Sequence, residues 1–226
     1  DGYIIDEEST MSSCYAILNG DNGFEIDTFG NNITLNGCEA IDNTDDGFAV
    51  VNSGDNIICN GCRSLSIDDV GIGIYTSSTS NVFVSNCFMQ NNTDHGLKIF
   101  DAVGIEISDC IIEGNTGDTQ STQVFMHETN NVRLVNCTIK GNNVLYPALF
   151  IDRAAGTDVP TKTILESCFI EGDYSLPFET DGLEEPIILG SVFTDSSGPA
   201  NATILASSAS AKIAIATTEH DVSNVI

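Results

Sequence analysis

The sequence predicts an all-β protein, a single-stranded parallel β-helix in which about eight or nine coils stack into a solenoid. Three observations predict this fold: regularly spaced cysteines, regularly spaced asparagines, and short stretches in which apolar and polar residues alternate. The cysteines are separated by 24, 24, 25, 23, 27 and 31 residues, at Cys14, Cys38, Cys62, Cys87, Cys110, Cys137 and Cys168. A unit of this length buries its apolar face only against neighbouring copies of itself.

Two further markers keep the same spacing and define the parts of each coil. A β-branched residue follows each member of a second series, Asn32, Asn56, Asn81, Gly104 and Asn131. An aspartate lies seven residues beyond each early cysteine, at Asp21, Asp45, Asp69 and Asp94. Stretches such as FEID and GIEISDC alternate with period two, so each coil is expected to read as turn, strand, turn, strand.

Stacking places like residues above one another, so we expect an interior ladder of cysteines and a ladder of asparagine amides at a turn. Eight cysteines is an even number and allows disulfides, but one cysteine per coil favours reduced, buried thiols and a reducing compartment for assembly. The phenylalanines that follow the turns are expected to point inward, at Phe24, Phe48, Phe83, Phe100 and Phe125.

The domain organisation predicted is a β-helix over residues 1–190, with regular coils from about 10 to 172, followed by a different segment over 191–226. The second segment contains TILASSASAKIAIATT and is rich in Ala, Ser and Ile. It is expected to form the last coils, a cap or an oligomerisation segment, and a homotrimer is one expected assembly.

The charge of the chain limits its partners. A formal net charge of −26 argues against nucleic acid as a partner, because phosphate binding needs clustered Lys and Arg. Anionic polymers would need a bridging cation, for which calcium is the expected candidate, although no cofactor is required. No apolar run is long enough to span a bilayer, so membrane insertion is not expected.

The DDG and DHG turns, the asparagines before Ile or Val, and the Asn-Gly-Cys strand ends resemble the pectin-lyase-like family. That resemblance covers residues 10 to 172 and implies a right-handed parallel β-helix, in agreement with the right-handed crossover rule. The family includes polygalacturonases, pectate lyases, epimerases and phage tailspikes, so it implies fold more strongly than function. A pectate-lyase reading needs an arginine beside the acids, and Arg63, Arg133 and Arg153 all fall outside the aspartate series.

The stretch NTDDGFAVVNSGDNI resembles the acid-bearing coil of polygalacturonases and supplies the candidate site. The candidate catalytic residues are Asp45, Asp46, Asp68, Asp69, Asp94 and His95. Carboxylates on adjacent coils lie about 5 Å apart at the backbone, and each raises the pKa of the other. Separations of about 6.5 to 9.5 Å would suit hydrolysis with inversion. His95 follows Asp94 where that family has glycine, and Gly96 stands where its substrate-binding arginine would be.

Other roles for these residues stay open. Asp and Asn before Gly also form tight turns without any catalytic purpose. Asp45, Asp69 and Asp94 are the candidate calcium ligands. Lys98, Tyr75 and Tyr146 are the candidate substrate-binding residues.

Three functions follow. The first is a structural or receptor-binding spike on a virion or at a cell surface, with shallow carbohydrate recognition. The alternative is a polysaccharide-degrading or epimerising enzyme, a glycoside hydrolase or lyase that uses the stacked aspartates. The third is a calcium-dependent surface adhesin, which the acidity alone favours. An enzyme of the second kind would be extracellular.

Overall fold

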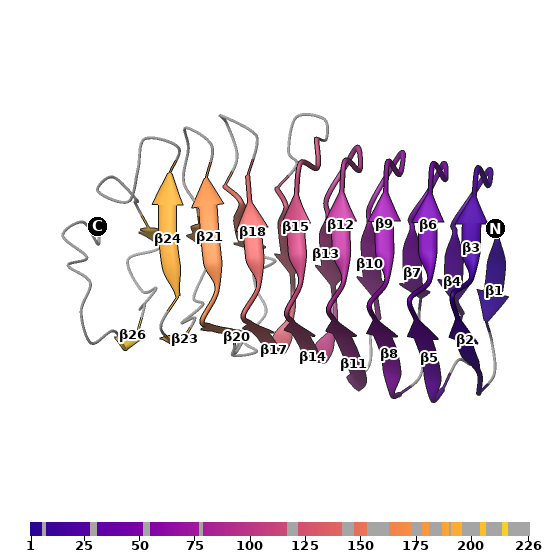
Figure 1. Ribbon diagram of the computed structural model, residues 1–226. Helices are drawn as coiled ribbons and strands as arrows, with labels where there is room; N and C mark the ends of the chain where they lie inside the picture. The colour runs from indigo at the N-terminus through magenta and orange to yellow at the C-terminus, as the bar shows by residue number, and fades with distance from the viewer. Residues whose placement is uncertain are drawn as a thin grey trace.

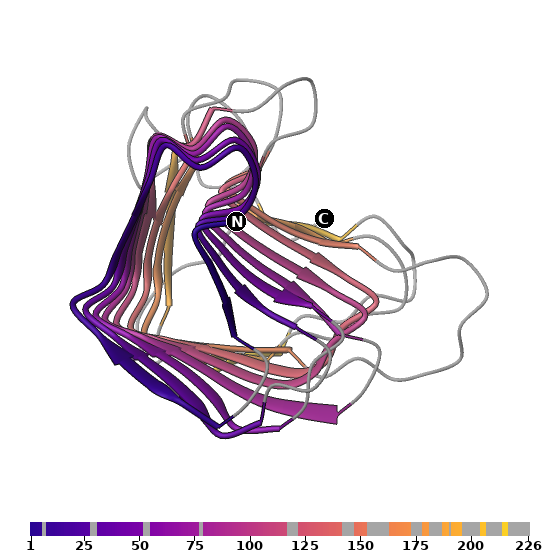
Figure 2. The ribbon, with the colours of Figure 1, turned by 90° about the vertical axis from the view of Figure 1, so that its right-hand side faces the viewer.

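The computed structural model shows a parallel β-solenoid (Figure 1). It describes residues 1–5, 8–27, 31–51, 55–76, 79–116, 122–141, 147–152, 163–172, 178–180, 187–189, 191–195, 204–206 and 214–216. Every strand pairing in these ranges is parallel and joins one coil to the next, and three sheets form the walls of the solenoid (Figure 2). The predicted all-β parallel solenoid is therefore confirmed.

Each coil contributes one short strand to each sheet. Sheet A contains β1 (Tyr3–Ile5), β4 (Phe24–Ile26), β7 (Phe48–Val51), β10 (Ile72–Tyr75), β13 (Leu97–Phe100), β16 (Val124–His127), β19 (Leu149–Asp152), β22 (Phe178–Thr180) and β25 (Ile204–Ala206). Sheet B contains β2 (Thr10–Ser12), β5 (Ile33–Asn36), β8 (Ile57–Asn60), β11 (Thr79–Ser85), β14 (Val103–Ser108), β17 (Asn130–Val135), β20 (Thr163–Glu166), β23 (Ile187–Leu189) and β26 (Ala214–Ala216). Sheet C contains β3 (Tyr15–Ile17), β6 (Glu39–Ile41), β9 (Arg63–Leu65), β12 (Phe88–Gln90), β15 (Ile111–Glu113), β18 (Thr138–Lys140), β21 (Phe169–Gly172) and β24 (Val192–Asp195).

The C-terminal segment set apart in the sequence continues these sheets where it is described. Strands β24, β25 and β26 pair in parallel with β21, β22 and β23 respectively. The residues between these strands lie outside the described ranges, so the boundary near residue 190 stays a prediction. Among the described helices and strands, no helix is long and apolar enough to cross a membrane.

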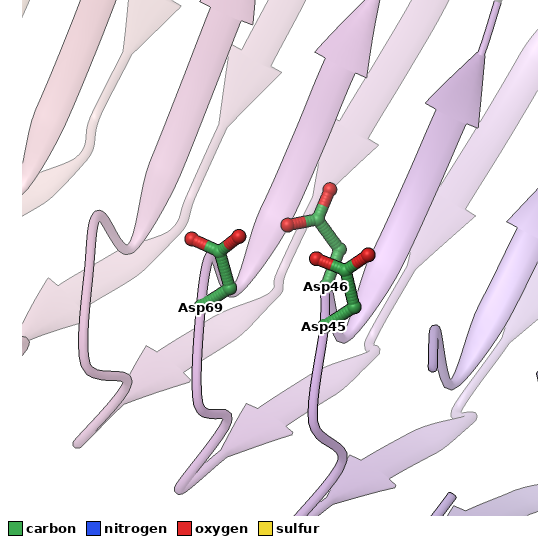
Figure 3. Close-up of side chains that lie close together, drawn as sticks. All are labelled: Asp45, Asp46 and Asp69. Atoms are coloured by element: carbon green, nitrogen blue, oxygen red, sulfur yellow. The ribbon is translucent and has the colours of Figure 1, made fainter. Parts of the chain in front are cut away.

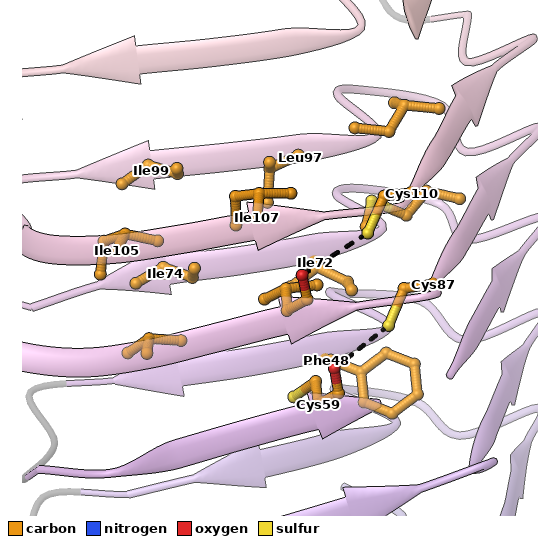
Figure 4. Close-up of a cluster of buried hydrophobic side chains, with 14 of the residues drawn as sticks. Phe48, Cys59, Ile72, Ile74, Cys87, Leu97, Ile99, Ile105, Ile107 and Cys110 are labelled. Carbon is orange, nitrogen blue, oxygen red and sulfur yellow. Dashed lines mark hydrogen bonds between the residues drawn. The ribbon is translucent and has the colours of Figure 1, made fainter. Parts of the chain in front are cut away.

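The cysteines form the interior ladder that the sequence predicts. Seven of the eight are buried and Cys14 is half-buried, and all eight are free thiols. From Cys38 to Cys168, each ladder thiol donates to a backbone carbonyl of the preceding coil, as Cys87 does to the Cys59 oxygen at 3.4 Å (Figure 4). These thiols pack in the core as small hydrophobic groups at the corner between sheets B and C.

Asparagines form two ladders, of which only the outer one was expected. Asn56 donates to the Oδ1 atom of Asn32 at 3.1 Å, at an exposed turn. Asn32, Asn56 and Asn131 have φ angles of 53°, 65° and 54°, in the left-handed region that asparagine tolerates better than β-branched residues do. This outer series therefore marks the turn between sheets A and B.

The second asparagine ladder is buried at the turn between sheets C and A and was not predicted from the sequence. Asn43, Asn92 and Asn115 are fully buried. The Nδ2 atom of Asn92 donates to Oδ1 of Asn115 at 2.8 Å, and Nδ2 of Asn19 donates to Oδ1 of Asn43 at 2.7 Å. The signal was present, because an asparagine follows four of the ladder cysteines by five residues, at Asn19, Asn43, Asn92 and Asn115.

The expectation that all five phenylalanines point inward is wrong for three of them. Phe24 and Phe48 lie in the core and stack on one another with ring centroids 4.9 Å apart. Phe83 is 41% exposed on sheet B, while Phe100 and Phe125 are half-buried on the outer face of sheet A. In β13 and β16 the apolar residues at the alternate positions, such as Leu97 and Val124, occupy the interior instead.

Candidate functional site

The candidate site lies at the turn that leads into β7, β10 and β13, on the outer side of sheet A. The backbone N–H of Gly47 donates to the Val70 oxygen, and that of Gly71 donates to the His95 oxygen, both at 2.9 Å. These bonds hold successive coils in register, so Asp46 and His95 occupy equivalent positions two coils apart. At the spacing of β-strands this separation is about 10 Å.

Three carboxylates come together at this turn, from Asp45, Asp46 and Asp69 (Figure 3). One oxygen of each lies within 4.8 Å of an oxygen of the other two. Asp45 is exposed, Asp69 is half-buried and Asp46 is only 3% exposed. Because the three groups differ so much in contact with water, they cannot all carry a charge at equal cost.

Asp46 is the most perturbed carboxyl of this cluster. Its pKa is raised to about 7, chiefly by burial and also by the charges of Asp69 and Asp45, although hydrogen bonds from Tyr75 and from the Val70 N–H act in the opposite direction. Asp46 therefore exchanges a proton near neutral pH. The same burial and the nearby Asp46 carboxylate raise the pKa of Tyr75, so its phenol stays protonated.

Asp69 is the second carboxyl with a raised pKa. Burial, a hydrogen bond with Asp45 and the charge of Asp94 raise it to about 6, and the charge of Lys98 lowers it. A hydrogen bond between two carboxyl groups requires a proton on one of them, and the raised pKa of Asp69 makes Asp69 the group that holds this proton in mildly acid solution.

His95 and Lys98 complete the site on the next coil. The Nδ1 atom of His95 lies 2.8 Å from the Thr122 carbonyl oxygen, and its Nε2 atom lies 3.5 Å from Asp94 Oδ1. A carbonyl oxygen only accepts, so Nδ1 carries the proton in the neutral ring and Nε2 carries the lone pair, beside the Asp94 carboxyl. Burial lowers the pKa of His95, which favours this neutral form. Lys98 Nζ lies 3.7 Å from Asp94 Oδ2.

A stack of aromatic rings runs from this site toward the C-terminal coils. His95 stacks on Phe125 with ring centroids 5.1 Å apart, and Phe100 stacks on His127 at 4.5 Å. Phe125 also lies 5.8 Å from Phe150 on the following strand. These rings are stacked between coils, so they fix the plane of His95.

The predicted site residues are only partly brought together. Asp68 lies apart from the carboxylate cluster and lines a separate shallow hollow with Asp42, Thr44 and Ser66. Tyr146 lies outside the described residues. The expected calcium ligands were Asp45, Asp69 and Asp94, whereas among the described residues the three carboxylates close enough to share an ion are Asp45, Asp46 and Asp69.

The carboxylate spacing affects which sugar chemistry is open to the site. Inverting hydrolysis needs carboxyl groups about 6.5–9.5 Å apart to hold a water between them. The oxygens of Asp45, Asp46 and Asp69 approach within 4.8 Å of one another, which leaves too little space for such a water. Asp46 is also too buried to attack a sugar as a nucleophile. Proton transfer is the chemistry that the raised pKa values of Asp46 and Asp69 favour.

A family model described as a right handed beta helix region matches residues 59–164. The chain contains a right-handed β-helix. The A-module of the mannuronan C-5 epimerase AlgE4 from Azotobacter vinelandii is similar over 93% of this chain, with a TM-score of 0.77 and 16% identity. The Agl-KA catalytic domain is similar over 92% of this chain, with a TM-score of 0.60 and 12% identity. The resemblance to pectin-lyase-like β-helices is thus confirmed for the fold.

The β-helix spans 58% of the length of the epimerase module and 47% of the Agl-KA domain. A search of the curated proteins gives no match. At 16% and 12% identity these likenesses show the fold and assign no function to the chain.

Proposed function

We propose that this β-helix is a polysaccharide-modifying module that moves protons on a sugar ring, with C-5 epimerisation of a uronan as its reaction. The observation that supports this most is the network on the outer side of sheet A, where Tyr75 bonds a buried Asp46 and His95 stands two coils away. Epimerisation needs one group to remove a proton and another to return it. The likeness to a mannuronan C-5 epimerase module supports the same reaction class.

His95 is the proposed base. Its Nδ1–H is held by the Thr122 carbonyl, and its ring plane is fixed by the stack with Phe125. Its Nε2 lone pair takes the proton from C-5 of the sugar, and the electrons of the C–H bond pass into the adjacent carboxylate group. A neutral histidine suits this step because protonated imidazole cannot accept a proton.

Tyr75 and Asp46 together are the proposed acid. When Asp46 is protonated, it can donate to the Tyr75 oxygen, and the Tyr75 O–H is then free to point toward the sugar. The phenol gives its proton to C-5, and Asp46 restores it. The pKa of Asp46, about 7, lets this carboxyl lose and regain a proton at neutral pH.

The charge of a uronate must be offset in a chain this acidic. Lys98 lies on the outer face of β13, and protonation of Asp69, whose pKa is raised to about 6, removes one negative charge beside it in mildly acid solution. A calcium ion bound to Asp45, Asp46 and Asp69 is the other way to offset that charge, since each offers one hard oxygen ligand. Calcium would displace the Asp69 proton. Activity that depends on calcium should therefore rise with pH, whereas activity that depends on protonated Asp69 should fall as pH rises.

The test is solvent isotope exchange. The chain is incubated in deuterated water with polymannuronate, polyguluronate, polygalacturonate or a neutral glucan, with and without calcium, and deuterium at C-5 is measured by NMR. We expect exchange in at least one uronan and none in the glucan. His95→Gln and Tyr75→Phe should each reduce exchange by about 10²-fold.

Asp68→Asn is the matched control, because it removes a carboxylate of the same coil that lies outside the cluster. Release of reducing ends would indicate hydrolysis instead, and formation of unsaturated sugar would indicate elimination. Absence of all three products from every polymer would reject the proposal and return the spike to first place.

A further inference from the structure

We propose that Gly73 is a positioning residue, which seats the Tyr75 ring across β10 so that its hydroxyl reaches Asp46. This inference rests on the proposed function, because it assigns the residue that holds the acid in place. Gly73 lies on the outer face of sheet A, where its neighbours in register are Ala49 on β7 and Lys98 on β13.

The backbone gives no reason for a glycine at this position. Gly73 is not among the described glycines with positive φ, so any residue could adopt its conformation. Glycine also weakens a strand interior, because it loses more chain entropy than other residues and offers nothing to pack. Its place in the middle of β10 therefore calls for a reason outside the backbone.

The space above Gly73 supplies that reason. A Cβ atom there would come within 2.5 Å of both Tyr75 Oη and Asp46 Oδ2, and it would overlap the Tyr75 ring at Cε2. All three atoms belong to the pair that we propose as the acid. The Tyr75 side chain thus lies back along its own strand, over the position where a side chain of residue 73 would stand.

Other glycines of the solenoid have a different role. A Cβ at Gly23, Gly47 or Gly71 would come 2.6 Å from a backbone carbonyl oxygen of the next coil. These glycines let adjacent coils approach at the turn, which is a requirement of the fold. Gly73 has no such backbone contact among its three nearest atoms, so its small size serves the side chains of the site.

Loss of this seat has a predictable electrostatic effect. The hydrogen bond from Tyr75 stabilises the charged form of Asp46 and lowers its pKa, against the effect of burial. A side chain at residue 73 pushes the ring away and removes the bond. The pKa of Asp46 should then rise above its value of about 7, and the acid should lose its connection to Tyr75.

The experiment is a double-mutant cycle read by carboxyl carbon-13 NMR, in which the titration of Asp46 is followed without substrate and with a chelator present, so that no metal ion occupies the carboxylate cluster. The proteins are the native chain, Gly73→Ala, Tyr75→Phe and the double variant. We expect both single changes to raise the pKa of Asp46 and the double variant to match Tyr75→Phe alone. Gly20→Ala is the matched control, since a Cβ at Gly20 meets nothing within 4 Å.

An unchanged Asp46 titration in Gly73→Ala, with a clear rise in Tyr75→Phe, would overturn the proposal. If Gly73→Ala fails to fold, the variant with Tyr75→Ala added should recover folding, because it removes two of the three atoms that the new Cβ meets and leaves room for the Asp46 carboxyl to move away from it. Equal failure of that variant would also overturn the proposal. None of these readouts uses a polysaccharide, so a negative isotope-exchange result would reject the proposed reaction separately.

Discussion

Replacement of Asp46 by asparagine should stabilise the protein at alkaline pH and remove part of its pH dependence. The folded state raises the pKa of Asp46 from 3.8 to about 7. Between these two values the folded protein keeps a proton that the unfolded chain has released, so the free energy of unfolding falls as pH rises through this window. Asparagine cannot ionise, and its amide oxygen can still accept from the Val70 N–H, while its NH2 group can donate to the Tyr75 oxygen.

The magnitude follows from the size of the pKa change. One pKa unit corresponds to about 1.4 kcal/mol, so a rise from 3.8 to about 7 corresponds to an upper value of about 4 kcal/mol at pH 8. Part of this cost comes from the nearby charges of Asp69 and Asp45, and the pKa of Asp69 is itself raised to about 6, so its titration overlaps with that of Asp46. We therefore expect Asp46→Asn to gain about 2–4 kcal/mol over the native chain at pH 8, and close to none at pH 4.

The assay is urea denaturation followed by circular dichroism at pH 4 and pH 8. The control is Asp68→Asn, because it removes one charge from the neighbouring coil at an exposed position. This control accounts for the general repulsion in a chain of net charge −26. If Asp46→Asn and Asp68→Asn show the same difference between the two pH values, burial of Asp46 has no special effect and the reasoning is refuted.

Two further predictions concern the interior ladders. Asn92→Ala should lower the free energy of unfolding by about 2–4 kcal/mol, because Asn92 Oδ1 accepts from the buried Ile67 N–H at 3.1 Å and Nδ2 donates to Asn115. Thr93→Ala, at the exposed neighbouring position, should have little effect. Equal losses of stability in the two variants would contradict a role for the buried ladder. An aromatic disulfide reagent should modify Cys14 quickly and the seven buried thiols only after unfolding, and rapid reaction of more than one thiol in the folded chain would show that the ladder is accessible.

Much of the fold could be predicted because a solenoid repeats in one dimension. The cysteine spacing gave the coil length, and stacking at that spacing put each cysteine above the next inside the structure. The direction of Phe100 and Phe125 was harder to predict, since the strands are short and apolar residues stand on both faces. Both faces carry apolar residues here because the outer aromatic rings pack on one another between coils.

The site could be predicted only as far as its turn. The Asp45 and Asp69 series is a local pattern, so the sequence placed these residues on neighbouring coils. Asp68 was grouped with Asp69 because the two are adjacent in sequence, but adjacent residues at a turn point to different sides. The partner of Asp46 was missed as such, because Tyr75 is 29 positions further along the chain and was considered only as a substrate-binding residue.

The sequence by itself determined the repeat, the parallel β-helix and the line of aspartates, because each depends on spacing along the chain and on the period of a strand. Only the tertiary structure decided which carboxyl is buried, where the Tyr75 ring lies and which nitrogen of His95 carries the lone pair. Those features depend on contacts with the next coil and on the space left by Gly73, and neither is encoded in the neighbouring residues of any one position.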